Sequence, residues 1–94
     1  MITETLEKLE RIHKEVYSFS DIRSFRAAGG GDHFRSQVRQ ALAGVRVKDL
    51  LVLCRHLKQP AIGNKERLIE RIEWYCVTAQ ANSLAILGVD VDLG

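Results

Sequence analysis

The sequence predicts an all-α fold. Apolar residues recur at spacings of three and four along several segments, as expected for helices that bury one face. Residues that break helices separate these segments, namely the glycines at 29–31, Gly44 and Pro60. The one alternating run, at 89–94, has no partner strand and so does not make a sheet. With 94 residues, we expect one small domain with a limited core.

The N-terminal segment from about Glu4 to Phe19 predicts a long amphipathic helix. Its apolar stripe consists of Ile2, Leu6, Leu9, Ile12, Val16 and Phe19. Charged residues four positions apart, such as Glu4 and Lys8, cover the opposite face. The stripe can cover the helices that follow it, or it can pair with a second copy of the chain. We favour the first interpretation.

Two shorter helices are expected next. Ser20 is a suitable N-cap for a helix over residues 21–28, which the three glycines end. Asp32 is the expected N-cap of a third helix, His33–Ala43, and Gly44 ends that helix. The glycines lack the preceding strand and the following lysine of a phosphate-binding loop, so we interpret them as a flexible hinge.

The central stretch, Val45–Tyr75, carries the clearest pattern, which predicts two helices joined by a loop. The first helix has a stripe formed by Val47, Leu50, Cys54 and Leu57. Pro60 is expected to stop this helix, Gly63 to allow a reversal and Asn64 to cap the second helix. The second stripe consists of Leu68, Ile69, Ile72, Tyr75 and Cys76.

The central stretch resembles the SAP domain, a small helix–loop–helix module that binds nucleic acid. The family pattern is valine, two residues, leucine, a loop, glycine–any–lysine, two residues, leucine–isoleucine, any, arginine. This chain matches it at Val47, Leu50, Gly63–Asn64–Lys65, Leu68–Ile69 and Arg71, over about a third of its length. The chain departs from the family at Lys58–Gln59, where glycine–leucine is usual. A weaker resemblance is to the LEM-like helix-extended-loop-helix class, which mainly binds proteins.

The resemblance implies contact with DNA, often AT-rich duplex, made largely through the backbone by the loop and the start of the second helix. The motif match places Gly63, Asn64, Lys65 and Arg71 in this contact. Position and charge add Arg46, Lys48 and Arg67. RNA is a further candidate ligand. The chain has no array of side chains suited to reading base edges, so base-specific contact is not expected.

The charge of the chain is mixed, with 14 basic and 12 acidic residues giving +2. This balance excludes a strongly basic coat protein but allows a local basic face. Residues 44–76 carry seven Lys or Arg against four Asp or Glu.

The second central helix separates its charges onto two flanks. Arg67, Arg71 and Trp74 share one side of the apolar stripe. The other side carries Glu66, Glu70 and Glu73. We expect both arginines to hold their charged ends in solvent, for phosphate contact or for pairing with Glu70. Trp74 is expected to be a core anchor, with contact to a sugar or base as the alternative.

No constellation of catalytic or metal-ligating residues is apparent. His13, His33 and His56 are dispersed, and Cys54, His56 and Cys76 fall short of four zinc ligands. We therefore expect no enzyme activity, no cofactor and no metal. The two cysteines are best explained as small buried apolar residues in a reducing compartment, although a disulfide between them is geometrically conceivable.

The sequence thus predicts an N-terminal helical extension (1–43), a SAP-like helix–loop–helix (44–79) and a C-terminal tail (80–94). The tail can continue the second helix or pack separately, and its end can fray or dock through Val89, Val91 and Leu93. The leading functional hypothesis is a small non-enzymatic protein that binds double-stranded DNA. The rival is a protein-interaction adaptor, or a homodimer, using the helix pair or the N-terminal helix. Without a signal peptide or a membrane-spanning run, we expect an intracellular protein of the cytoplasm, nucleoid or nucleus, without membrane contact.

Overall fold

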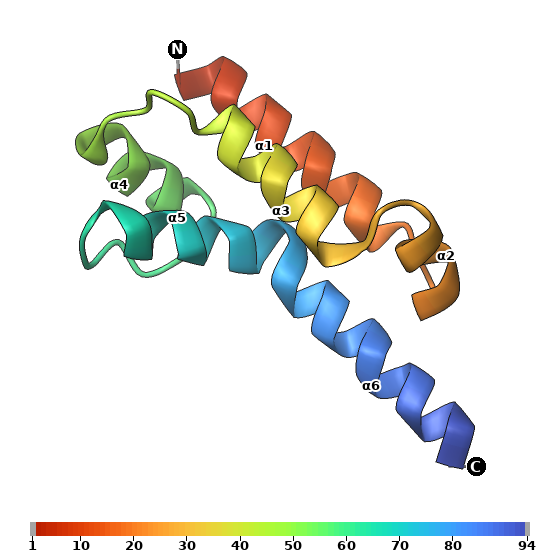
Figure 1. Cartoon of the computed structure of the whole chain (residues 1–94). Helices are drawn as coiled ribbons and strands as arrows, with labels where there is room; N and C mark the ends of the chain where they lie inside the picture. Colours follow the sequence, from red (N-terminus) through yellow and green to blue (C-terminus); the bar gives the residue numbers. More distant parts are fainter. Residues whose placement is uncertain (1, 94) are drawn as a thin grey trace.

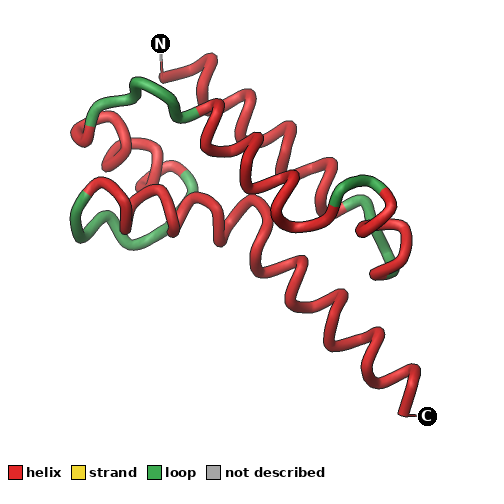
Figure 2. The backbone as a smooth tube through the Cα atoms, in the orientation of Figure 1, coloured by secondary structure: helices red, strands yellow, loops and turns green. Residues whose placement is uncertain are grey.

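The computed structural model describes residues 2–93, with side chains described as far as residue 88, and within this range all regular secondary structure is helical (Figure 2). The elements are α1 (Ile2–Tyr17), α2 (Ile22–Ala27), α3 (Gly30–Ala41), α4 (Val47–His56), α5 (Lys65–Glu73), the π-helix η1 (Trp74–Thr78) and α6 (Ala79–Leu93). The predicted all-α class is confirmed. No helix in the described range is long and apolar enough to cross a membrane.

A long, bent helix made of α5, η1 and α6 organises the molecule (Figure 1). The helices α1 and α3 pack along its middle against η1, α4 packs beside α5, and α2 lies against α6. After α4, the connection over residues 57–64 runs back to the end of the molecule where α4 begins. The helices α4 and α5 therefore begin at the same end and run in the same direction (Figure 1). The far end of α6 extends beyond the body.

The N-terminal stripe lies in the core, as the first interpretation predicted. Leu9, Ile12 and Val16 of α1 are buried, and Ile2, Leu6 and Phe19 pack against the same core. The helix contacts mainly η1 and α3. Because these contacts use the apolar face of α1, little of that face remains for another partner.

Two N-cap predictions and the hinge interpretation are wrong. Asp21, not Ser20, caps α2, because its Oδ1 accepts a hydrogen bond from the Ser24 amide at 2.8 Å. The N-cap of α3 is Gly29, with φ 122°, so Gly30 and Gly31 form the first turn instead of a hinge. The residue expected as the cap, Asp32, lies within that turn, where the helix dipole favours an acid.

The end of α4 also differs from the prediction. The helix stops at His56, before Pro60 can act. The Gln59 amide donates to the Cys54 carbonyl at 2.8 Å and the Lys58 amide to the Arg55 carbonyl at 3.1 Å, the paired bonds of a Schellman motif. Lys58 has φ 57°, a left-handed conformation that glycine adopts at lower cost. This is the position at which the chain departs from the SAP pattern.

The start of α5 agrees with the prediction. Gly63 has φ 118°, and the Asn64 side chain accepts a hydrogen bond from the Arg67 amide at 2.9 Å. A Cβ at residue 63 would lie 3.0 Å from the Cβ and Cγ of Arg67, which leaves little space for a side chain there. Glycine and asparagine thus fix the direction in which α5 begins.

The π-helix explains why the apolar pattern weakens after Cys76. In η1 the Ala79 amide donates to the Trp74 carbonyl, five residues back, so this turn contains an additional residue. Once that residue is discounted, Val77 and Leu84 fall on the same face as Ile72, and all three are buried. The tail continues the second helix, as one predicted alternative had it, and α6 reaches Leu93 without fraying. The predicted docking side chains Val89, Val91 and Leu93 lie outside the described ones.

The two cysteines are free and buried, as expected. The Cys54 thiol donates to the Leu68 carbonyl at 3.8 Å, and the Cys76 thiol to the Leu9 carbonyl at 3.6 Å. Burial raises the pKa of Cys76 to about 12. Both residues therefore act as small packing residues with weak internal hydrogen bonds.

Candidate nucleic-acid interface

Four exposed cations stand where α4 and α5 begin. Arg46 is the N-cap of α4 and Lys48 lies in its first turn, whereas Lys65 and Arg67 belong to the first turn of α5. Both helices start at the same end of the molecule (Figure 1). We call this surface, defined by Arg46, Lys48, Lys65 and Arg67, the basic end.

The cations of the basic end are largely unpaired, although each first turn also holds an acid, Asp49 in α4 and Glu66 in α5. Among the described residues, Arg46, Lys48 and Lys65 form no ion pair, and Arg67 pairs with Glu70 at 3.6 Å. The positive ends of two helix dipoles add about half a charge each. The Arg67 amide is taken by Asn64 and the Asp49 amide by the Arg46 carbonyl, whereas the amides before them in each first turn have no partner within their own helix. These features together favour the binding of an anion such as phosphate.

Apolar side chains accompany the cations. Ile62, next to Gly63, is 73% exposed, and Val47 in the first turn of α4 is 43% exposed. Gly63 and Asn64 are themselves exposed, although their defined role is to shape the loop. The surface therefore combines cations with two projecting aliphatic groups.

Arg71 does not hold its whole charged group in solvent as expected. The residue is half-buried, and its buried Nε has no hydrogen-bond partner among the described residues. It lies near Cys54. Burial raises the pKa of that thiol, and the positive charge of Arg71 offsets part of the rise. Of the seven predicted site residues, Arg71 is therefore the one that the fold holds nearest to the core.

The prediction that Trp74 is a core anchor is wrong. Trp74 is 49% exposed, because it lies two residues, or about 200° round the helix, after the fully buried Ile72 and so on the outer side. The neighbouring Tyr75 is the aromatic residue that packs on α1. It stacks on His13 with ring centroids 4.3 Å apart, and its hydroxyl donates to Glu10 at 2.9 Å.

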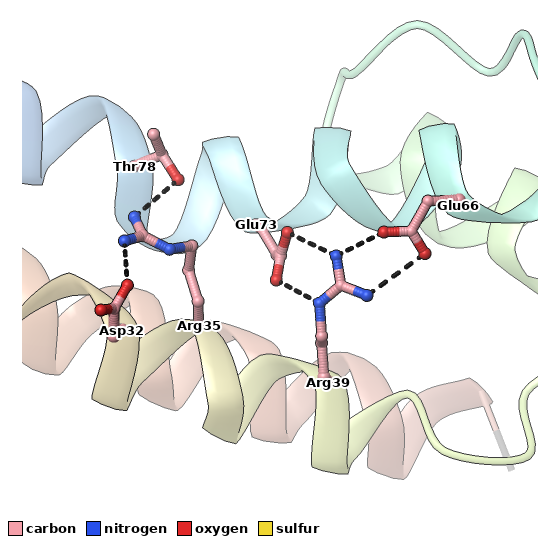
Figure 3. Close-up of polar contacts among 6 residues, drawn as sticks. All are labelled: Asp32, Arg35, Arg39, Glu66, Glu73 and Thr78. Atoms are coloured by element: carbon pink, nitrogen blue, oxygen red, sulfur yellow. Dashed lines mark hydrogen bonds and ion pairs between the residues drawn. The ribbon is translucent and has the colours of Figure 1, made fainter.

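The acidic flank of α5 is not simply a solvated face. Arg39 of α3 reaches across to two of its carboxylates (Figure 3). Its Nε donates to Glu73 at 2.7 Å and its Nη2 to Glu66 at 2.7 Å. The Glu73 side chain is only 8% exposed, and the hydrogen bonds lower the pKa of Glu66. The partners are far apart in the sequence, so the amphipathic pattern gave no sign of this contact.

A second contact joins α3 to the same long helix. Arg35 donates to Thr78 at 3.3 Å and pairs with Asp32 at 2.8 Å (Figure 3). With Arg39, it fixes α3 along the side of the long helix that carries Glu66, Glu73 and Thr78. The acidic side chains Glu66 and Glu73 are thereby engaged and do not compete for the cations of the basic end.

The structure offers little for metal chemistry. Within the described residues, no three His, Cys, Asp or Glu side chains gather as a metal site would require. His13 is stacked between Tyr17 and Tyr75, with centroids 4.3 Å away on each side.

No protein-family model, curated protein or solved structure matches this chain.

Proposed function

We propose that this protein is a small, non-enzymatic nucleic-acid-binding protein that holds double-stranded DNA by its phosphate backbone at the basic end. The parallel arrangement of α4 and α5, which gathers four exposed cations beside two helix N-termini, is the observation that carries the proposal. The SAP-like pattern points to the same surface. The two free thiols suit action inside the cell, in a reducing compartment.

In this proposal the residues of the basic end act in different ways. Lys48, Lys65 and Arg46 contribute charge, and Arg67 exchanges its long contact with Glu70 for a phosphate. Gly63 and Asn64 hold the loop in shape, so that the α5 amides face the ligand. Such contacts position a duplex without reading its sequence. RNA remains a candidate because a phosphate backbone is common to both nucleic acids.

Charge reversal at the basic end tests the proposal. The variant Lys48→Glu/Lys65→Glu should bind a labelled duplex much more weakly than the wild type, at every sequence tested. The matched control Lys8→Glu/Lys14→Glu makes the same change of charge on the exposed side of α1. It should lose far less affinity, because those residues lie outside the basic end. Circular dichroism melts confirm that both variants are folded.

Salt dependence gives a second measure of the same contacts. Lys65→Gln should reduce the slope of log affinity against log salt by about one unit, since one phosphate contact is lost. If both double variants weaken binding equally, only net charge matters and the basic end is not the site. A wild-type protein that binds no duplex at low salt would refute the proposal itself.

The rival function is a protein-interaction adaptor. It is favoured by Ile86 and Leu87, which are 61% and 56% exposed on α6. The version of this hypothesis that uses the N-terminal helix is weakened, because the apolar stripe of α1 is already buried. Binding through an apolar surface would depend little on salt, whereas phosphate binding weakens steeply. The same titrations therefore separate the two functions.

A further inference from the structure

Trp74, the one tryptophan in the chain, is a half-exposed aromatic residue beside the basic end. On the long helix it lies three residues after Arg71 and seven after Arg67, so these three side chains form one strip along the outer face. Within the described residues, its indole stacks on no other ring. Aromatic packing therefore does not account for this large side chain, half of which is exposed.

The neighbouring arginine supplies a second observation. The Nε of Arg71 is the buried side-chain polar atom that has no hydrogen-bond partner in the described part of the chain. The Arg71 guanidinium also forms no ion pair within the described residues, so the arginine charge is left for an external anion. An exposed indole beside a guanidinium without an ion-pair partner is suited to a ligand that is both aromatic and anionic.

We infer that Trp74 stacks on an unpaired base of the bound nucleic acid, with Arg71 beside it, so that the preferred ligand is a duplex that carries a single-stranded extension. The inference rests on the proposed function at the basic end and names the form of nucleic acid that the surface takes. A paired base inside a duplex does not offer its face to a side chain, whereas an unpaired base does.

The spacing along the helix agrees with this ligand. From Lys65 to Trp74 the axis rises about 14 Å at 1.5 Å per residue. That length corresponds to about four nucleotides at 3.4 Å per step. Duplex phosphates at the basic end and an unpaired base at Trp74 thus fall within one short ligand. Stacking does not distinguish the four bases, so the extension is selected for being unpaired.

A protein partner fits this strip less well. Trp74 shares its side of the helix with Arg67 and Arg71, and the acid one turn before it, Glu70, already pairs with Arg67 at 3.6 Å. The apolar residues Ile86 and Leu87 lie at least twelve residues further along the helix, so Trp74 does not belong to that patch. The surroundings of Trp74 are therefore cationic, which favours a polyanion.

Fluorescence of the single tryptophan tests the inference. The probes are a short blunt duplex and the same duplex extended by a few unpaired thymidines, with heparin as a polyanion without bases. The extended duplex should quench Trp74 strongly and bind about tenfold or more tighter than the blunt one, the effect of one stacked base. Heparin should bind without comparable quenching.

Substitutions at the strip complete the design. Trp74→Ala should reduce affinity for the extended duplex to that for the blunt one without changing the salt slope, because indole carries no charge. Trp74→Phe should retain part of the preference, and the control Ile86→Ala should retain all of it. Equal affinities of the wild type for both duplexes would overturn the inference and leave the proposed function standing. A fluorescence blue shift that grows with protein concentration alone would also overturn it, since Trp74 would then contact a second copy.

Discussion

The contact between Arg39 and Glu73 permits a quantitative test of how α3 is attached to the long helix. In Arg39→Met the Glu73 carboxylate, only 8% exposed, loses hydrogen bonds of 2.7 and 3.1 Å. Removing one partner of a fully buried ion pair costs about 3–5 kcal/mol. The Arg39 side chain is 44% exposed, so water reaches the site and replaces part of the loss. We therefore expect the free energy of unfolding to fall by about 1–2 kcal/mol.

Urea denaturation followed by circular dichroism measures this change. The midpoint should fall in Arg39→Met while the slope m stays constant. The double variant Arg39→Met/Glu73→Leu should recover much of the loss, because no buried charge is left unpaired and the exposed Glu66 is solvated. Glu66→Gln, which alters an exposed carboxylate on the same arginine, should change the midpoint much less. This reasoning would be refuted if Arg39→Met had the same urea midpoint as the wild type. It would also be refuted if the double variant were less stable than both Arg39→Met and Glu73→Leu.

Three further predictions concern the core, the turn after α4 and alkaline pH. Leu50 is fully buried, so Leu50→Ala should lower the free energy of unfolding by about 2–5 kcal/mol in a thermal melt. Lys58→Gly should raise the melting temperature, because it relieves a left-handed conformation that costs about 1 kcal/mol. Burial raises the pKa of Cys76 from 9.0 to about 12, so the folded protein keeps a proton that the unfolded chain loses. Stability should therefore be full below about pH 9 and decline toward pH 12, less steeply in Cys76→Ala.

Each of these predictions can fail in a distinct way. An unchanged melting temperature in Leu50→Ala would mean that α4 does not pack as described. A lower melting temperature in Lys58→Gly would mean that the entropy of the unfolded chain outweighs the strain at this residue. Urea midpoints that stay constant up to pH 12 would mean that the Cys76 thiol ionises as readily in the folded protein as in the unfolded chain.

The features that the sequence predicted well depend on neighbouring residues. The stripe of α1, the φ of Gly63 and the cap of Asn64 follow from spacing and from the chemistry of single residues, and all three are confirmed. The N-cap at Asp21 was missed by one residue, because serine and aspartate are equally good caps and only the backbone decides between them.

The features that could not be predicted depend on tertiary contacts or on an irregular turn. Arg39 meets Glu73 across 34 positions, and no local pattern encodes that pairing. A regular helical wheel already places Trp74 beside Arg71, and the expectation of burial came from the general tendency of large aromatic residues. What the wheel does not represent is the additional residue of η1, which shifts the register of Val77 and Leu84. Within the candidate site, sequence alone placed the exposed cations of α4 and α5, but it did not separate the half-buried Arg71 from them.

The additional residue in η1 also determines where the chain can change its length. Deleting one residue from 74–78 would let the long helix close as regular α-helical turns while Leu84 keeps its place in the core. A deletion a few residues later, inside α6, would instead rotate everything beyond it by roughly 100° and turn Leu84 away from the core. The π-helix is thus the point along residues 65–93 at which a shorter chain can keep the same fold, with the surface around Trp74 as the part that changes.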